Sequence, residues 1–246
     1  MGYRFLIDTN LPIDTDDEAV AAVLRGFDVA VDGSTDLPLI GRRVAGHEPD
    51  LAYIPSADWQ RALRRGDRHY RGFVMPTSKF TGSTDLPSVL VVRKDDPAEG
   101  LMDLRGASYG FINSSCTSSY FPPIVMLHAH GIRFADFFDG RPVEAWQGQV
   151  DAVTAGEVRA TMVPEDVWRT TPGNADTTKV IDRYEDAKPA VIVARRGLDP
   201  ALLSALTDAL VDWVPPWSGV YGCFKPFLYA DVHHFFHELG KLPANT

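Results

Sequence analysis

The chain has 246 residues, of which 45% are hydrophobic and 23% charged, and its formal net charge is −9. This length is enough for one large hydrophobic core or two smaller ones. Nucleic-acid binders usually carry a basic stripe, whereas the densest basic run here, Arg61–Arg71, is short and is better explained as a solvated helix face. No stretch approaches the ~18 apolar residues of a membrane span. We therefore expect no nucleic-acid partner and no membrane insertion.

The cysteine and histidine patterns argue against a metal site. Cys116 and Cys223 are the two cysteines, and without a Cys-x-x-Cys pair a structural zinc site is not expected. Whether they form a disulfide is left open. His233 and His237 share a predicted helix face, but no glutamate of an H-E-x-x-H pattern accompanies them, so a solvated face is the better interpretation.

The first residues leave two localisations open. Met1 leads directly into a strand-like segment, without a charged n-region followed by an apolar h-region. The protein is periplasmic or otherwise extracytoplasmic if a signal peptide has been removed, and cytoplasmic if Met1 is the native start.

Strands and helices are expected to alternate through the first half of the chain. Phe5–Ile7 is the first predicted strand, and Asp8, Thr9 and Asn10 follow its C-terminal end, where open α/β sheets place ligands. Asn10 is therefore a candidate ligand-binding residue. The other strands predicted in this half lie at 28–31, 50–56, 73–75 and 88–93, and the helices at 16–24 and 57–65.

The second half continues the alternation. Strands are predicted at 109–112, 143–146, 158–163, 179–184 and 190–194, and helices at 101–105, 120–131, 149–155, 200–213 and 231–239. Alternating strands and helices predict an α/β fold with mostly parallel strands.

A run of small polar residues lies between a predicted strand and a predicted helix. Tyr109–Ile112 is the strand, Asn113–Ser119 is the polar run, and Pro122 and Pro123 are tolerated only in the first turn of the helix. The free N–H groups and positive dipole end of a helix N-terminus favour an anion there. The alternative is that one Ser or Thr is simply an N-cap.

Four stretches have an order and spacing that resemble a known family. They are 50–55 (Asp-Leu-Ala-Tyr-Ile-Pro), 88–106, the 115–120 loop and 153–158 (Val-Thr-Ala-Gly-Glu-Val). Together they resemble the phosphate, phosphite and phosphonate-type solute-binding proteins of ABC transporters, which belong to the type II periplasmic-binding-protein superfamily. The resemblance covers roughly Asp50 to Trp213.

The resemblance implies a fold of two α/β lobes with a two-strand hinge and a ligand cleft between the lobes. The hinge would lie near Val91–Asp95 and Val191–Arg195. Lobe 1 would then comprise residues 1–92 plus 192–246, and lobe 2 residues 93–191.

The resemblance also implies a ligand site. In the family a Ser-Thr-Ser-Gly run at this helix start holds an oxyanion; here Thr117 and Ser118 match it, while Cys116 and Ser119 depart from it. It implies a small oxyanion-containing ligand (phosphonate-like, phosphate-like or a carboxylate), an ABC permease as partner, and no cofactor. With Asn10, taken from its position after the first strand, the candidate ligand-binding residues are Tyr53, Pro55, Ser88, Ser115, Cys116, Thr117, Ser118, Ser119, Tyr120, Trp146, Gln147 and Glu165.

An enzyme on the same fold is the alternative. Signal-less members of the superfamily include decarboxylase-like enzymes and enzymes of menaquinone and thiamine-precursor synthesis. Cys116 at a helix N-terminus would be its nucleophile, which needs a nearby base. The sequence cannot place any candidate base beside the thiol; the candidates are His128, His130, His233 and His234. We therefore assign no catalytic residue and favour the binding protein.

Overall fold

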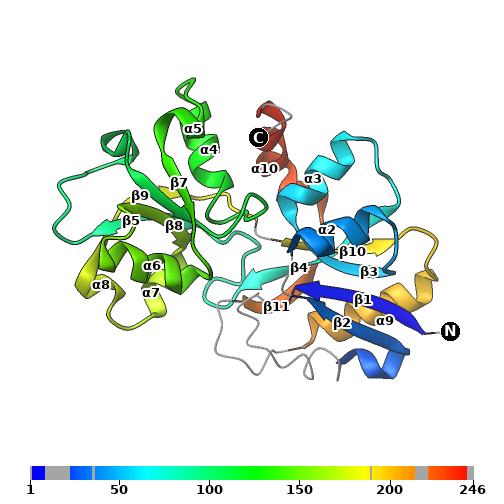
Figure 1. The fold of residues 1–246 in the computed structure, drawn as a ribbon. Helices are drawn as coiled ribbons and strands as arrows, with labels where there is room; N and C mark the ends of the chain where they lie inside the picture. The colour runs from blue at the N-terminus through cyan, green and yellow to red at the C-terminus, as the bar shows by residue number, and fades with distance from the viewer. Residues whose placement is uncertain (1, 9–22, 35–36, 189, 214–220, 243–246) are drawn as a thin grey trace. The chain divides into compact units, whose positions relative to one another are not determined.

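The computed structural model describes residues 2–8, 23–34, 37–188, 190–213 and 221–242 (Figure 1). The chain forms two compact units, each assembled from two stretches of sequence. The first unit comprises Met1–Thr84 and Ala190–His233, and the second comprises Asp85–Pro189 and His234–Thr246. The chain thus passes between the units after Thr84, Pro189 and His233. The candidate residue Asn10 lies outside the described residues.

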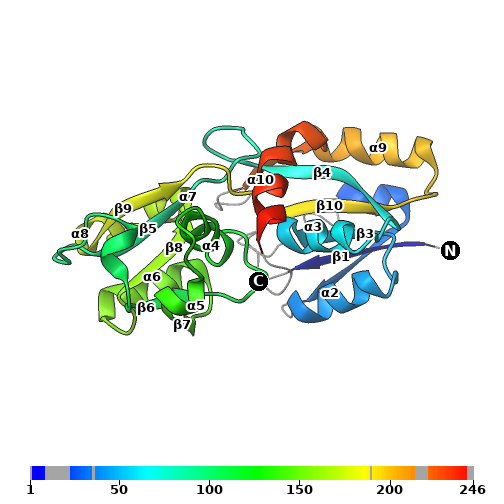
Figure 2. The ribbon, with the colours of Figure 1, turned by 90° about the horizontal axis from the view of Figure 1, so that it is seen from above.

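The first unit contains a six-stranded sheet in the order β11-β4-β10-β3-β1-β2. Its strands are β1 (Tyr3–Asp8), β2 (Val29–Ser34), β3 (Leu51–Pro55), β4 (Tyr70–Ser78), β10 (Ala190–Arg195) and β11 (Tyr221–Pro226). Its helices are the 3-10 turn η1 (Arg25–Phe27), α2 (Leu37–Ala45), α3 (Ser56–Arg64), α9 (Pro200–Val211) and the first part of α10 (Tyr229–Lys241). Figure 2 shows α9 on one side of this sheet and α2 on the other.

The central strands of the first sheet are apolar because helices cover both faces. All five residues of β3 are buried, and β10 is buried from Ala190 to Ala194. In α9, Leu203, Leu206 and Leu210 recur at three- and four-residue spacing and form the buried stripe of an amphipathic helix.

The second unit contains a five-stranded sheet in the order β7-β6-β8-β5-β9. Its strands are β5 (Ser88–Arg93), β6 (Ser108–Phe111), β7 (Asp139–Pro142), β8 (Ala160–Pro164) and β9 (Thr178–Tyr184). Its helices are the 3-10 turn η2 (Leu101–Leu104), α4 (Phe121–His128), α5 (Phe134–Phe137), α6 (Trp146–Ala155), α7 (Glu165–Thr170), α8 (Asn174–Thr177) and the end of α10.

Alternating residues of β5 supply the cores on the two faces of the second sheet. Leu90 and Val92 pack in the cluster that contains Leu127 of α4, whereas Val89 and Val91 pack with Val150 of α6. This alternation follows from the two-residue period of a strand. Helices α4 and α6 therefore cover opposite faces.

The predicted α/β fold is confirmed, but the prediction of mostly parallel strands is wrong. β1 pairs in parallel with β2 and β3, and β6 with β7 and β8. β10 runs antiparallel to both of its neighbours, and so does β5. Both sheets are therefore mixed. With the antiparallel pair of β11 and β4, five of the nine pairings among the described strands are antiparallel.

Several predicted elements need correction. The strand predicted at 143–146 is wrong, since β7 ends at Pro142 and Trp146 begins α6. α2 and β11 were not predicted. Val91–Arg93 form the end of β5 inside the second sheet, and the passage of the chain into the second unit lies earlier, after Thr84.

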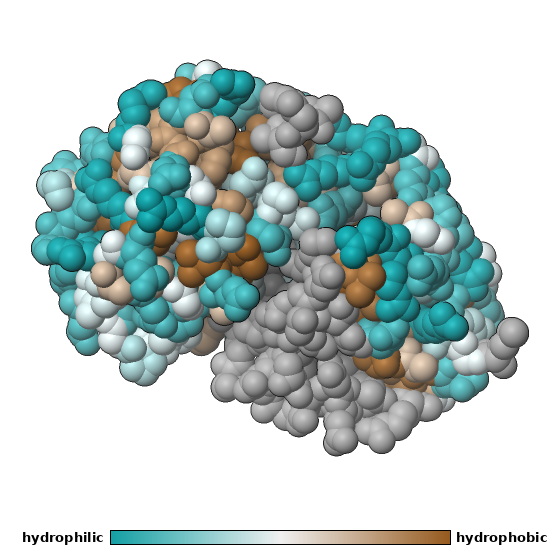
Figure 3. Space-filling view, viewed as in Figure 1, coloured by the Kyte–Doolittle hydropathy of each residue, from teal (hydrophilic) through white to brown (hydrophobic). Residues whose placement is uncertain are grey.

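Most of the surface visible in Figure 3 is polar, with apolar side chains in separate areas. The large hydrophobic side chains that are exposed come from different elements: Leu39, Phe80, Met102, Val180, Leu228 and Tyr229. Every helix of the described residues falls short of the length and apolarity that a bilayer span requires.

Candidate functional site

Most of the predicted site residues lie along the edge of the second sheet that is formed by the ends of its strands. β6 and β8 run in parallel and end at this edge, while β5 is antiparallel to β8 and begins there, with Ser88 opposite Pro164. Tyr184, at the end of β9, is the other register partner of Ser88. We call the positions at these strand ends, with the 112–120 loop that follows β6 and Glu165 that follows β8, the polar edge.

The 112–120 loop is folded by its own backbone and side-chain bonds. The side-chain oxygen of Asn113 accepts a hydrogen bond from Ser115 N–H at 2.9 Å. Its backbone carbonyl accepts a second one from Cys116 N–H at 3.1 Å. Cys116 O in turn accepts from Tyr120 N–H at 3.1 Å. α4 starts directly afterwards with Phe121, and Pro122 and Pro123 occupy its first turn, as predicted.

Ser118 and Ser119 present polar groups for which the described residues supply no partner. Ser118 is 1% exposed, and its Oγ makes no hydrogen bond within the described part of the chain. In that part, the backbone N–H groups of Ser118 and Ser119 also meet no acceptor. A buried donor without a partner costs about 1–3 kcal/mol, so this turn is energetically suited to an added acceptor such as an oxyanion.

Ser119 is held by the strand that precedes the loop. The Tyr109 hydroxyl donates to Ser119 O over 2.7 Å, and Ile112 N–H donates to Ser119 Oγ over 3.2 Å. Tyr109 is fully buried, and burial raises its pKa well above the usual value, so its hydroxyl remains a donor. The side chain of Ser119 thus closes the loop on the sheet.

The buried carboxamide of Gln149 connects α6 to the same loop. One end of the amide lies 2.9 Å from Thr161 Oγ1, and the other end is 2.9 Å from Ile112 N. All partners are satisfied when the amide oxygen accepts from Ile112 N–H and the amide nitrogen donates to Thr161 Oγ1 and Met162 O. Thr161 then donates its own proton to Gly110 O at 2.9 Å.

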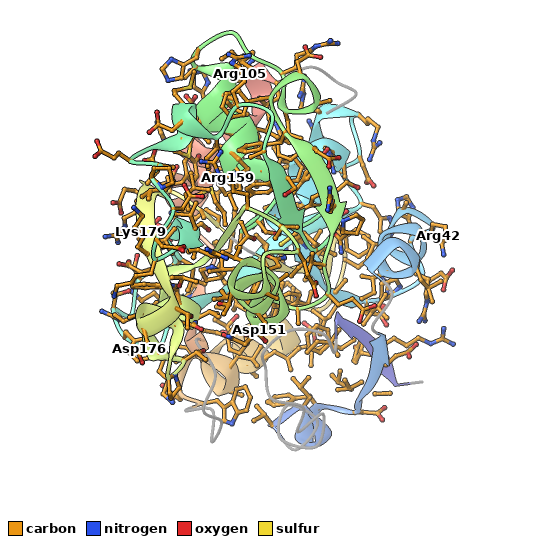
Figure 4. The ribbon with its side chains drawn as sticks, turned by 60° about the vertical axis from the view of Figure 1, so that its left-hand side comes forward. Arg42, Arg105, Asp151, Arg159, Asp176 and Lys179 are labelled. Carbon is orange, nitrogen blue, oxygen red and sulfur yellow. The ribbon has the colours of Figure 1, made fainter. Side chains whose placement is uncertain are left out.

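The other candidates in the second unit differ in how far their polar groups are already engaged. Ser88 is 0% exposed, and within the described residues its Oγ meets no partner. Gln147 is engaged: its amide nitrogen donates to Asp151 Oδ1 at 2.8 Å and Asn174 Oδ1 at 2.9 Å. Figure 4 labels Asp151 on α6. Glu165 pairs with an arginine, as described below.

Aromatic packing and the free thiols complete the surroundings of the loop. The Tyr120 ring lies 5.1 Å from Phe111 and 5.5 Å from Phe134, and Trp146 packs against the cluster on the α6 face. Cys116 is buried, and both it and Cys223 are free thiols, so the disulfide left open by the sequence does not form.

Tyr53 and Pro55 belong to the first unit, at the end of β3. Both are buried, and Pro55 precedes the first residue of α3, Ser56. Ser56 is 0% exposed, and its Oγ has no hydrogen-bond partner among the described residues. Sequence reasoning missed Ser56, although a Ser directly after a strand and at a helix start is a recognisable signal.

Sequence reasoning also missed Gln149 and Thr161, because nothing in their local pattern marks them as partners of a distant loop. Groups of three metal-ligating side chains do not occur among the residues that the structure describes.

The family model described as the periplasmic substrate-binding protein of a phosphonate ABC transporter matches residues 15–215. No curated protein matches the chain.

Solved structures share the fold at low sequence identity. PhnD1 from Prochlorococcus marinus in complex with methylphosphonate is similar over 98% of both chains, with 14% identity and a TM-score of 0.75. XAC2383 from Xanthomonas citri bound to ATP is similar over 98% of both chains, with 16% identity and a TM-score of 0.71. A phosphonate-transporter binding protein from Pseudomonas aeruginosa is similar over 96% of this chain and 84% of that chain, with 16% identity and a TM-score of 0.70.

Proposed function

The chain belongs to the family of periplasmic substrate-binding proteins of phosphonate ABC transporters and is a solute-binding protein, and we propose that its 115–119 loop binds an oxyanion group of the solute. The observation that carries this proposal is the buried turn of Ser118. Its hydroxyl and the N–H groups of Ser118 and Ser119 are donors without acceptors among the described residues.

The chemistry of these donors suits a phosphonate-like or phosphate-like group. Two consecutive N–H groups and a hydroxyl can meet two or three oxygens of one anion, and α4 directs its positive dipole end toward the same turn. Hydrogen bonds to a charged acceptor contribute about 1.5–3 kcal/mol each. Thr117, Ser115 and Cys116 are proposed to line the same turn.

Other residues are proposed to complete the site. Ser88 is a further buried donor at the polar edge, and the Tyr120 ring, Trp146 and Gln147 would flank the ligand. In the first unit, Tyr53 and Pro55 are the proposed contributors, with Asn10 retained from the sequence. We take the two compact units as the two lobes, and an ABC permease as the partner that receives the solute.

Calorimetric titration of the whole chain tests the proposal. The probes are inorganic phosphate, phosphite, methylphosphonate and methanesulfonate; PhnD1 is a methylphosphonate complex, which motivates the third. We expect at least one probe to bind, and Ser118→Ala to weaken its binding about tenfold or more, equivalent to about 1.4 kcal/mol.

Ser114→Ala is the matched control. Ser114 is an exposed hydroxyl of the same loop, and its removal should change affinity less than twofold. Failure of all four anions to bind, or equal affinities for wild type and Ser118→Ala, would overturn the proposal.

A further inference from the structure

Three buried or half-buried carboxylates at or just beyond the polar edge have a cation beside them. Glu165 Oε2 lies 2.7 Å from Arg183 Nη2, and Asp166 Oδ1 lies 3.0 Å from Arg169 Nη2. Asp186, just after β9, lies 3.0 Å from the buried ammonium group of Lys188, which also pairs with Asp85. Each of these three carboxylates therefore has a cation beside it, and Lys188 is shared between Asp186 and Asp85.

Arg183 holds Glu165 from a neighbouring part of the sheet. Glu165 is the first residue of α7 and is fixed there by its N–H, which donates to Pro87 O over 2.7 Å. Arg183 reaches it from β9, where it is the register partner of Val89 in β5. Its Nε also lies 3.0 Å from Glu185 Oε1. The guanidinium is thus held by two carboxylates.

The side chain of Gln147 is engaged at both ends. Its amide nitrogen donates to Asp151 and Asn174, and its amide oxygen accepts from Asn174 Nδ2 at 3.2 Å. Among the described residues, the polar groups without a partner at this edge are the hydroxyls of Ser88, Ser118 and Tyr184 and the N–H groups of Ser118 and Ser119, all of which can donate.

We propose that Arg183 is a specificity-determining residue, which occupies Glu165 and so makes the site selective for oxyanions that carry no amine. This inference rests on the proposed function. An ammonium group on the ligand would have to displace a guanidinium from Glu165 or exchange its hydration for neutral hydroxyl and carbonyl oxygens, and either event is unfavourable. An uncharged substituent meets neither penalty.

Arg183→Gln tests the proposal by freeing Glu165. The two probes are ethylphosphonate and 2-aminoethylphosphonate, which differ only by the amine, titrated by calorimetry into the whole chain. We expect the wild type to prefer ethylphosphonate at least tenfold. In Arg183→Gln the affinity for 2-aminoethylphosphonate should rise at least fivefold, while that for ethylphosphonate stays within twofold.

Three further variants separate charge pairing from a general structural effect. The double variant Arg183→Gln with Glu165→Gln should lose the gain for the amine, because the freed carboxylate is gone. Arg183→Lys should keep the wild-type preference, because it keeps a cation beside Glu165. Arg141→Gln removes an exposed arginine that pairs with Asp139 on β7, and it should change neither affinity.

Two results would overturn the proposal: a wild type that binds 2-aminoethylphosphonate as tightly as ethylphosphonate, or a folded Arg183→Gln variant with no gain for the amine. Should Arg183→Gln not fold, the wild-type comparison alone decides. Failure of the proposed function would look different, since neither phosphonate would then bind the wild type, or Ser118→Ala would leave both affinities unchanged.

Discussion

The Tyr109 hydroxyl donates to the carbonyl oxygen of Ser119 over 2.7 Å and thereby ties the exit of the donor-bearing loop to the strand at its entrance. Both residues are 0% exposed, so water cannot replace the bond. Ser119 Oγ also accepts a hydrogen bond from Ile112 N–H. The position of Ser119 therefore determines where the neighbouring Ser118 presents its donors.

Tyr109→Phe should lower the free energy of unfolding by about 1–3 kcal/mol, since it leaves a buried carbonyl without its donor. Urea denaturation of the variant measures the change. Tyr120→Phe is the control: it removes a hydroxyl from the same aromatic cluster, and we expect a change below about 0.5 kcal/mol. Equal effects of the two substitutions would contradict the role given to the Tyr109 bond.

Gln149→Leu should cost about 1–3 kcal/mol of unfolding free energy, because it removes the amide donor from Met162 O and leaves Ile112 N–H with Ser119 Oγ alone. It should also weaken binding of the anion that the wild type binds, since Ile112 opens the loop. Thr154→Ala, on an exposed position of the same helix, serves as the control for denaturation and calorimetry. Unchanged stability would show that water replaces the carboxamide.

The ion pair of Asp96 with Arg159 should make the second unit sensitive to acid. Arg159 Nε and Nη2 lie 2.8 Å and 3.0 Å from the two carboxylate oxygens, and these hydrogen bonds hold the pKa of Asp96 below its ordinary value. Figure 4 labels Arg159. A carboxylate whose pKa is lower in the folded state stabilises the protein at any pH above its pKa in the unfolded chain, about 3.9. This stabilisation is lost as the pH falls through the pKa of the folded state.

Asp96→Asn should therefore lower stability at pH 7 by about 1 kcal/mol, a modest figure because the Arg159 side chain is 37% exposed and partly screened. The loss should shrink as the pH approaches 3. Denaturation at several pH values measures it, with Asp95→Asn, an exposed neighbour paired with Arg93, as the control that should show no loss. A constant effect of Asp96→Asn at every pH would refute the linkage.

His69 should make the first unit less stable in mild acid. Its ring stacks on that of His47 at a centroid distance of 3.8 Å, and burial, then the charge of His47, lower the pKa of His69 below 6.5. The folded state thus binds this proton less readily than the unfolded state, so stability is lost as the pH falls from about 6.5 toward the folded pKa.

Hydrogen exchange of the β3, β4 and β10 amides reports on the first unit alone. Protection should fall between pH 7.5 and pH 5.5 in the wild type and fall less in His69→Gln. His130→Gln, at an exposed position of the second unit, should behave as the wild type. An identical decrease in His69→Gln would exclude the stacked pair as the cause.

Gly72→Ala should destabilise the first unit by about 1–3 kcal/mol, since a Cβ at this position would overlap the Phe227 ring. That ring packs edge-on against Trp59 at a centroid distance of 5.1 Å, so a shift of the ring would disturb this contact. Gly41→Ala is the matched control, because its Cβ would meet nothing within 4 Å, and alanine in a helix should stabilise by about 0.5–1 kcal/mol. Thermal melts should shift in opposite directions.

The sequence predicts the strand-loop-helix unit around Ser118 well, because Pro122 and Pro123 restrict where α4 can begin and an apolar strand precedes the loop. It does not predict β7, whose four residues are all exposed and give no apolar signal. The strand directions were mispredicted because the alternation of strands and helices does not indicate which strands pair or in which direction they run. The contact of Arg183 with Glu165 depends on the sheet order β8-β5-β9, which no local pattern specifies.

β10 lies between β4 and β3 in the first sheet, although it is separated from β4 in sequence by all of residues 85–189. During synthesis, residues 85–189 must therefore emerge from the ribosome before β10, the strand that joins the two halves of the first sheet. Until then β3 and β4 each expose an edge on which β10 will later pair. The first 84 residues thus emerge as an incomplete sheet whose unpaired edges favour aggregation, whereas residues 85–189 leave the ribosome with all five of their own strands.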